Sequence, residues 1–318
     1  MKMLKMKWRP SGPAGKTETI YCQTLFFPFM RRVIAGLEAQ DRLRTAENYR
    51  TALNSFLRFR GGEDLPLREM DCELMRRYEL YLTGQGIVKN TVSFYMRILR
   101  AVYNRAVEKK LTEQRNPFRH VYTGIDKTAK RAIPFAAIKR IKALDLSRQP
   151  ALDFARDMFL FSFYTRGMSF VDMAYLQKRD LKHGILTYHR RKTGQPLAVR
   201  WEQCMQEIVE KYGTEPENPY LLPILRWPSD RPENRYRSAQ QQINKSLKEI
   251  ARMAGVGIPL TMYVARHSWA STAKSMNIPV SVISEGMGHE SEATTRIYLA
   301  SLDTAIVDRA NRLILKGL

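Results

Sequence analysis

The sequence predicts a mainly α-helical fold with a small β-sheet, in which a helical N-terminal domain precedes a mixed α/β C-terminal domain. Four observations predict this architecture. Apolar residues recur at helical spacing through the first third of the chain, whereas the second part contains one strand–turn–strand pattern among further helical segments. Helical periodicity is lost between residues 115 and 134, and a chain of 318 residues exceeds the usual size of one domain.

The first domain is expected over residues 21–114, after a basic N-terminal extension at residues 1–20. Four segments with an apolar stripe predict four helices here, and they begin FPFMRR, TAENYR, DCELMR and KNTVSF. We expect Asn90 to be the N-cap of the fourth helix, because its side chain can accept a hydrogen bond from the first turn.

Residues 115–134 carry two prolines and a glycine, which predicts a linker before a second domain at residues 135–318. In this domain, ALDFARDMFLFSFYTRG predicts an apolar helix that ends near Gly167. The segment GILTYHRRKTGQPLAVRW predicts two strands around the turn KTGQ. Later helices are predicted by RSAQQQINKSLKEIARMAGVG, YVARHSWASTAKSMN, PVSVISEGMG, SEATTRIYLAS and an amphipathic tail from Asp303 to Leu318.

The chain is strongly basic, with 53 Lys and Arg against 31 Asp and Glu, a formal net charge of +22 and a pI of about 10.0. Such an excess favours nucleic acid or an anionic membrane as the partner. No run of about 18 apolar residues and no signal peptide is recognisable, which argues against the membrane. The three widely spaced cysteines predict neither a disulfide framework nor a zinc site. We therefore expect a cytoplasmic, nucleoid-associated protein that binds double-stranded DNA.

Cationic side chains on the fourth helix and beside the predicted turn are the candidate DNA contacts; they are Arg97, Arg100, Arg105, Lys109, Arg190 and Arg191. The alternative is that these charges form an ordinary solvated helix face. The excess of positive charge over the whole chain favours DNA.

The sequence has no P-loop, HExxH or EF-hand motif, and its five histidines are not paired at metal-ligand spacing, so no metal site is expected. Phosphate chemistry would then depend on fixed cations and proton donors. The candidates are Arg166 at the end of an apolar helix, Lys192 on a turn, Arg266, His289 after a Gly-Met-Gly segment, and Tyr298 nine residues later. Each residue type alone is common in globular domains, so their order and spacing carry the argument.

That order resembles the C-terminal signature of the tyrosine recombinase (phage integrase) family: Tyr263-x-x-Arg266, then Met287-Gly288-His289, then Tyr298. Upstream, FSFYTRGMSFVDMAYLQKRDL resembles the family segment with the first arginine, here Arg166, and RRKTG resembles the hairpin with the catalytic lysine, here Lys192. The resemblance extends over the whole chain. It implies a SAM-like core-binding domain, a linker and a recombinase catalytic domain.

The resemblance implies a site-specific DNA strand transferase, in which Tyr298 forms a covalent 3′-phosphotyrosine intermediate. Arg166 and Arg266 would clamp the phosphate because a guanidinium donates two aligned hydrogen bonds and keeps its charge. His289 would donate a further bond, and Lys192 would protonate the leaving 5′ oxygen. The family implies a homotetramer on paired DNA sites, needs no cofactor, and admits accessory DNA-bending proteins. The tail would dock on a neighbouring subunit or on its own domain.

Two positions depart from the family pattern. Tyr263 stands where histidine or lysine is common, and Ser169 stands where an acidic residue is expected, with Asp172 as the nearest carboxylate. Together with the segment RGMSFVDM, these two positions make the sequence resemble integrases and invertases of Bacteroidetes-type mobile elements. The short N-terminal extension favours a simple recombinase or invertase over an integrase that needs arm sites. Two alternatives stay open: a type IB topoisomerase-like enzyme and a catalytically silent DNA-binding relative.

Overall fold

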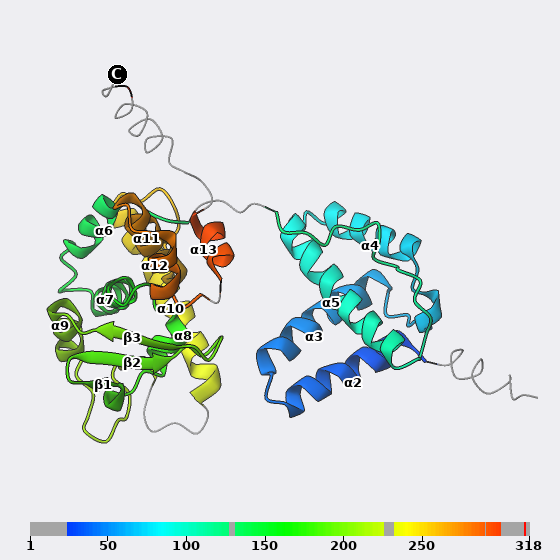
Figure 1. Ribbon diagram of the computed structural model, residues 1–318, viewed down its shortest axis with the longest axis horizontal. Coiled ribbons are helices and arrows are strands. Elements are labelled where there is room, and N and C mark those ends of the chain that lie inside the picture. The colour runs from blue at the N-terminus through cyan, green and yellow to red at the C-terminus, as the bar shows by residue number, and fades with distance from the viewer. Residues whose placement is uncertain (1–23, 127–130, 226–231, 290, 300–314, 316–318) are drawn as a thin grey trace, which may run out of the picture. The chain divides into compact units, whose positions relative to one another are not determined.

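The computed structural model describes residues 24–126, 131–225, 232–289 and 291–299, together with Leu315. The chain divides into two compact units, Met1–Thr128 and Ala129–Leu318 (Figure 1). The predicted extension at residues 1–20 and, apart from Leu315, the predicted tail lie outside the described residues. None of the helices in the described ranges is long and apolar enough to cross a membrane.

The first unit is helical, as predicted. Its helices are α2 (Phe26–Ala39), α3 (Leu43–Phe59), α4 (Cys72–Gly84) and α5 (Lys89–Glu108), with a 3₁₀ turn at Leu67–Glu69. Helix α5 contacts each of the other three helices. Aromatic rings fill the core, where Phe56 meets Tyr78 at 4.9 Å and the Tyr78 hydroxyl donates to Ser55 Oγ at 2.8 Å. This core carries the apolar stripes that the sequence shows.

Part of the predicted linker packs against the first unit. Phe118 and Val121 are buried in its core, and the Phe118 ring meets that of Tyr103 edge-on at 6.3 Å. Asn90 is not an N-cap, because Val88 holds that position in α5. The Asn90 side chain instead exchanges two hydrogen bonds with the Asp126 backbone, at 3.0 and 2.8 Å, and so fixes the end of this segment.

The second unit is mixed α/β, as predicted. Its helices are α6 (Phe135–Lys142), α7 (Pro150–Tyr164), α8 (Phe170–Ala174), α9 (Gln203–Lys211), α10 (Pro232–Met253), α11 (Met262–Ser275), α12 (Val280–Gly286) and α13 (Glu292–Leu299). The strands are β1 (Leu181–Lys182), β2 (Ile185–His189) and β3 (Pro196–Arg200), after a 3₁₀ turn at Lys178–Asp180. Helices α6, α8 and α9, strand β1 and both 3₁₀ turns were not predicted.

Helix α7 is the central element of this unit. It contacts α6, α9, α10 and α11, and its residues Met158, Phe159 and Phe161 are fully buried. The sheet is an antiparallel meander in the order β1-β2-β3. The pairing of Tyr188 with Leu197 and of His189 with Pro196 leaves the residues between them as the connecting turn, as the sequence predicts.

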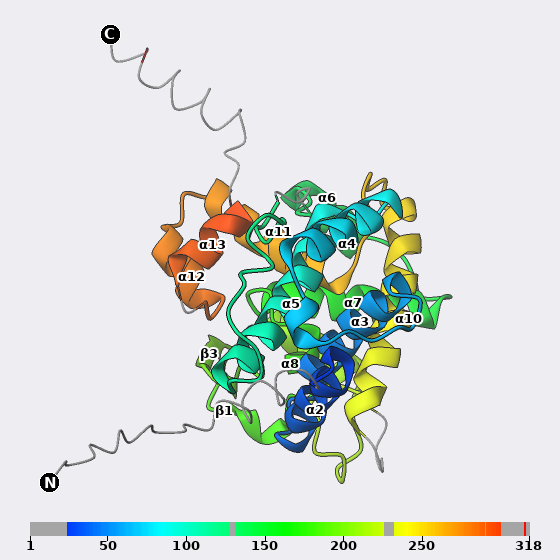
Figure 2. The same ribbon diagram turned by 90° about the vertical axis from the view of Figure 1, so that its right-hand side faces the viewer.

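The last three helices form a small cluster of their own. Ala270 and Ala273 of α11 pack with Ile283 and Met287 at α12 and with Leu299 of α13. Helices α12 and α13 contact each other, and they stand together in Figure 2. Lys274 Nζ donates to the Leu299 carbonyl at 2.7 Å, which fastens the end of α13 to α11.

Candidate active site

Arg266 lies at the centre of a buried polar cluster in the second unit. It comes from the first turns of α11, and its side chain is only 5% exposed. Nη1 donates to the Gly167 carbonyl and Nη2 donates to the Met287 carbonyl, each at 2.7 Å. These bonds join α11 to the end of α7 and to the end of α12. The fold therefore fixes the guanidinium in one orientation.

Gly167 allows α7 to approach Arg266 this closely. A Cβ atom at residue 167 would lie 2.7 Å from Arg266 Cα and 2.8 Å from its Cγ. Gly167 also has a φ of +75°, in the left-handed region that glycine adopts at little cost. A glycine after the first arginine is therefore a packing requirement of the second arginine.

His289 completes the cluster and is held through both ring nitrogens. Nε2 lies 3.0 Å from Arg266 Nη2, and Nδ1 lies 2.7 Å from Thr295 Oγ1 of α13. Because arginine only donates, Nε2 accepts and the ring proton is on Nδ1. Burial lowers the pKa of His289 to about 4, and the charges of Arg266, Arg190 and Lys192 act in the same direction. His289 is thus neutral at pH 7, with one ring N–H and one ring nitrogen that accepts.

The β2–β3 hairpin brings Lys192 to the edge of this cluster. Lys192 is exposed on the turn, and the effect of its charge on His289 places it within electrostatic reach of that ring. Arg190, at the start of the turn, was expected to contact DNA. Its side chain is instead 9% exposed, and Nη1 donates to the Gly288 carbonyl at 2.6 Å. The hairpin folds back on the segment before His289, so Arg190 is a member of the cluster.

Asp172 also holds the start of the hairpin turn. Its Oδ1 accepts from the Arg191 backbone N–H at 2.9 Å, and its Oδ2 accepts from Ser169 Oγ at 2.6 Å. The Arg191 guanidinium lies 4.1 Å from the centre of the Tyr175 ring, and its side chain is exposed. The buried carboxylate therefore supports the turn that carries Lys192.

Arg166 joins the end of α7 to the sheet. Its φ is +61°, which is uncommon for a non-glycine residue, and such conformations concentrate at functional sites. Nη1 donates to the Ala198 carbonyl of β3 at 3.3 Å. A Cβ at Gly286 would lie 3.6 Å from Arg166 Cδ, so the arginine stem passes the end of α12. Arg166 therefore reaches the two elements that flank Arg266 and His289.

Comparison with known protein families identifies both units. Residues 25–123 match the phage integrase SAM-like domain, and residues 152–305 match the phage integrase family. The chain belongs to the tyrosine recombinase family. It is an enzyme of site-specific DNA recombination, a DNA strand transferase.

Curated relatives and solved structures agree with this family. The recombinase is 24% identical over 246 residues to the tyrosine recombinase XerA of Pyrococcus furiosus, covering 74% of this chain and 80% of that protein. It is 24% identical over 302 residues to the tyrosine recombinase XerD of Halalkalibacterium halodurans, covering 92% and 97%. The structure of a lambda integrase tetramer bound to a Holliday junction has the same fold, with a TM-score of 0.66 and 15% identity, covering 89% of this chain and 80% of that chain.

Of the remaining predicted catalytic residues of the recombinase, Tyr263 lies apart from the buried cluster. Tyr263, in the first turn of α11, is 44% exposed, and its ring meets the His267 ring edge-on at 4.5 Å. Burial lowers the pKa of His267 to about 4, so this histidine is neutral as well. Tyr298 belongs to α13, one turn after Thr295, but its side chain lies outside the described residues.

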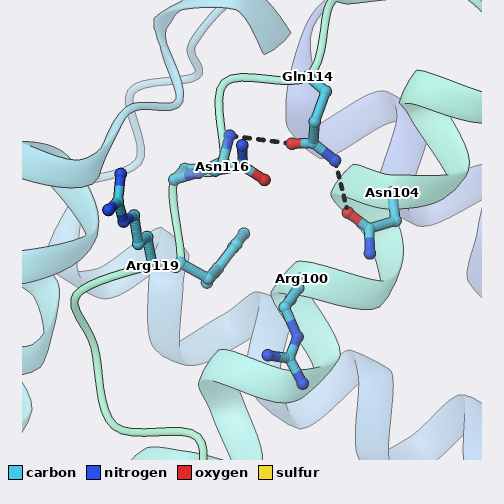
Figure 3. A pocket seen from close by; sticks show the side chains of 7 residues that line it. Arg100, Asn104, Gln114, Asn116 and Arg119 are labelled. Carbon is cyan, nitrogen blue, oxygen red and sulfur yellow. Dashed lines mark hydrogen bonds between the residues drawn. The ribbon is translucent and has the colours of Figure 1, made fainter.

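The predicted DNA contacts of the recombinase on α5 divide into two stripes. Arg97 and Arg100 are exposed on one stripe. Arg105 is half-buried, and its guanidinium lies 5.8 Å from the centre of the Tyr49 ring. Lys109 is exposed directly after the helix. Arg105 thus has a contact within the bundle, and Arg100, which lines the pocket drawn in Figure 3, donates from Nη1 to Thr123 Oγ1 at 3.3 Å.

The sequence held unused evidence for two of the supporting residues. Ser169-x-x-Asp172 has the spacing of a helix N-cap, and Ser169 does cap α8. No local pattern indicates the bond from Arg190 to Gly288, which joins residues 98 positions apart.

Among the residues in the described ranges, no group of three or more His, Cys, Asp or Glu side chains could hold a metal ion.

Proposed function

We propose that this recombinase cuts DNA through Tyr298. The phenol oxygen attacks the scissile phosphorus, the bond from phosphorus to the 5′ oxygen breaks, and a 3′-phosphotyrosine forms. The phenol loses its proton and the 5′ oxygen gains one. Because the phosphotyrosine conserves the energy of the broken bond, the 5′ hydroxyl of another strand can reverse the step and seal the DNA without ATP.

The fixed position of Arg266 is the observation that carries this proposal. Its guanidinium is buried and held by Gly167, Met287 and His289 before any DNA is bound. A cation that is already oriented stabilises the charge that grows on the phosphate oxygens without reorganising during the reaction. Arg166, at the end of the neighbouring α7, supplies the second charge of the clamp.

His289 is assigned the proton of Tyr298, which requires Nε2 to exchange the hydrogen bond from Arg266 for one from the phenol. The ring is neutral at pH 7, and its Nε2 is the nitrogen without a proton. Thr295, which holds the other ring nitrogen, belongs to the same helix as Tyr298. A phenol with an ordinary pKa near 10 is a weak nucleophile at pH 7 unless a base and nearby cations favour its ionised form.

Lys192 is assigned the proton for the leaving 5′ oxygen. It is exposed on a turn whose first two residues are held, Arg190 by its bond to Gly288 and Arg191 by Asp172. An ammonium group with this position can donate to an oxygen that leaves on the side opposite the attacking phenol. Tyr263 supplies a neutral hydroxyl near the phosphate, where many relatives have a cation.

The partner that fits the charge of +22 is double-stranded DNA, on which we propose that four copies assemble over paired sites. A lambda integrase tetramer bound to a Holliday junction, which has a similar fold, supports this assembly. The reaction then integrates, excises or inverts a mobile or invertible element, with accessory DNA-bending proteins as additional partners. Arg97, Arg100, Lys109 and Arg191 are the proposed backbone contacts.

The test uses the full chain and DNA from both sides of its own gene. Wild-type protein is expected to leave a covalent protein–DNA band on a denaturing gel, at one sequence, and Tyr298→Phe to leave none. Adducts at many positions with relaxation of any supercoiled plasmid would instead show a topoisomerase-like enzyme. Tight, specific binding without an adduct would show a catalytically silent relative.

A further inference from the structure

His289 is held by two helices at once. Its backbone N–H donates to the Ser284 carbonyl of α12 at 3.0 Å, and its ring nitrogen Nδ1 lies 2.7 Å from Thr295 Oγ1 of α13. Thr295 is fully buried, and it stands three residues before Tyr298 on the same helix. The ring of His289 therefore contacts the helix that carries the proposed nucleophile.

The contacts of the ring decide which of its nitrogens carries the proton. Arg266 Nη2 has two hydrogen atoms, of which one goes to the Met287 carbonyl at 2.7 Å and the other to His289 Nε2 at 3.0 Å. A guanidinium cannot accept a hydrogen bond, so Nε2 accepts and Nδ1–H donates to Thr295 Oγ1. A threonine hydroxyl can accept or donate, and at this position it accepts the ring proton.

The ring carries one proton and not two. Burial lowers the pKa of His289 to about 4, and the charges of Arg266, Arg190 and Lys192 act in the same direction. In a neutral imidazole, the hydrogen bond that one nitrogen makes fixes whether the other nitrogen can accept a proton. The partner of Nδ1 therefore determines whether Nε2 can act as a base.

The bond from the ring to Thr295 depends on the packing of α13. Leu299, at the end of this helix, is buried in one cluster with Ala270 of α11, and its carbonyl accepts from Lys274 Nζ at 2.7 Å. Tyr298 lies between Thr295 and Leu299 in the chain. The same helix thus brings in the nucleophile and the acceptor for the ring proton.

We infer that Thr295 is a positioning residue, which keeps the ring proton of His289 on Nδ1 and so leaves Nε2 able to take the proton of Tyr298. The inference rests on the proposed function and adds that α13 supplies both the nucleophile and the group that prepares its base. In the proposed step the phenol proton moves to Nε2, and the ring, which then carries two protons, keeps its Nδ1–H on Thr295. Thr295 itself neither gains nor loses a proton.

The first test locates the ring proton by NMR, in the full chain with isotope-labelled nitrogen in its histidines. The signals of His289 are those that His289→Asn lacks. Wild type at pH 7 is expected to show a protonated Nδ1 and an unprotonated Nε2. Thr295→Val is expected to move the proton towards Nε2, whereas Thr295→Ser keeps the hydroxyl and the wild-type pattern. A wild-type ring with its proton on Nε2 would overturn the inference, even where Thr295→Val is unstable.

The second test measures the rate of adduct formation with cognate DNA. A buried donor without an acceptor corresponds to a change of about 5- to 150-fold, so Thr295→Val is expected to slow the reaction by this order. The deficit should shrink as the pH approaches 10, because the phenol then ionises without a base. A deficit that stays constant with pH would show that Thr295 only holds the helix in place, and it would overturn the inference.

Thr294→Val is the matched control, because it is the same substitution at the exposed neighbour on α13. It is expected to match wild type in both tests, and equal behaviour of Thr295→Val and Thr294→Val would overturn the inference. Failure of the proposed function gives a different pattern. If wild type forms no adduct, or Tyr298→Phe still forms one, the proposed function and the inference fall together. Adduct at Tyr298 with the ring proton on Nε2 removes the inference alone.

Discussion

Replacing Gly167 with alanine tests whether the fold positions Arg266 as described. The new Cβ would lie 2.7 Å from Arg266 Cα, whereas ordinary contact begins at 3.4 Å, so the arginine backbone moves by about 0.7 Å. Alanine at a φ of +75° costs about 1–2 kcal/mol of stability, and the overlap adds about 1–3 kcal/mol. A displacement of about 1 Å can reduce a catalytic rate about 10²-fold.

Gly184→Ala separates backbone strain from the overlap. Gly184 has a φ of +71°, and a Cβ there would have no atom within 4 Å. Both variants are melted thermally and assayed for covalent adduct with cognate DNA. Gly184→Ala is expected to lose only the strain energy and to keep full adduct formation. Gly167→Ala is expected to melt lower still, by about 2–4 °C for each further kcal/mol, and to form adduct about 10²-fold more slowly. Equal behaviour of the two variants would refute the packing of Arg266 against Gly167.

Three further predictions concern the cluster around Arg266. Arg190→Ala breaks a buried bond from a charged donor, so the free energy of unfolding falls by about 1.5–3 kcal/mol and adduct formation slows. The exposed Arg191→Ala loses only its contact with the Tyr175 ring, about 0.5–1 kcal/mol. Equal effects of the two variants in thermal melts would contradict the role of Arg190. The folded pKa of His289 is about 4 against 6.5 when unfolded, so stability falls as pH drops from 6.5 towards 4. His289 contributes about 2 kcal/mol of this loss between pH 7 and pH 5, and His267, with the same lowered pKa, contributes a similar amount. Urea titrations of His289→Asn should therefore show about half of the wild-type loss. Lys192→Ala is expected to slow cleavage of ordinary DNA about 10²–10⁴-fold. DNA in which sulfur replaces the leaving 5′ oxygen should restore the rate, because a thiolate leaves without a proton. Failure of this rescue would show that Lys192 is not the acid.

Local sequence patterns predicted most of the fold because each depends on residues close in the chain. The stripe in KNTVSFYMRILR predicted α5, and the KTGQ turn between two apolar segments predicted the hairpin of β2 and β3. The amphipathic α9 was missed although Met205 and Ile208 have helical spacing. Asn90 was predicted as a cap, but its partner is Asp126, 36 residues away, and local reasoning cannot find such a partner.

Local sequence patterns also could not predict how the residues of the candidate site contact one another. The order of Arg166, Arg266 and His289 was readable as a motif, but their contacts depend on how four elements converge. The neutral state of His289 follows from burial and from three surrounding cations, none of which is its neighbour in sequence. For the same reason, Arg190 looked like a surface charge beside Lys192, and only the folded hairpin places it against Gly288.

The identity of the nucleophile tests the central claim most directly. Wild-type adduct with cognate DNA is digested with nuclease and protease, and the peptide that carries a nucleotide is sequenced by mass spectrometry. The account predicts one modified residue, Tyr298, joined through phosphate to the 3′ oxygen of a single nucleotide position. A nucleotide on another residue such as Tyr263, or a linkage to a 5′ oxygen, would contradict it.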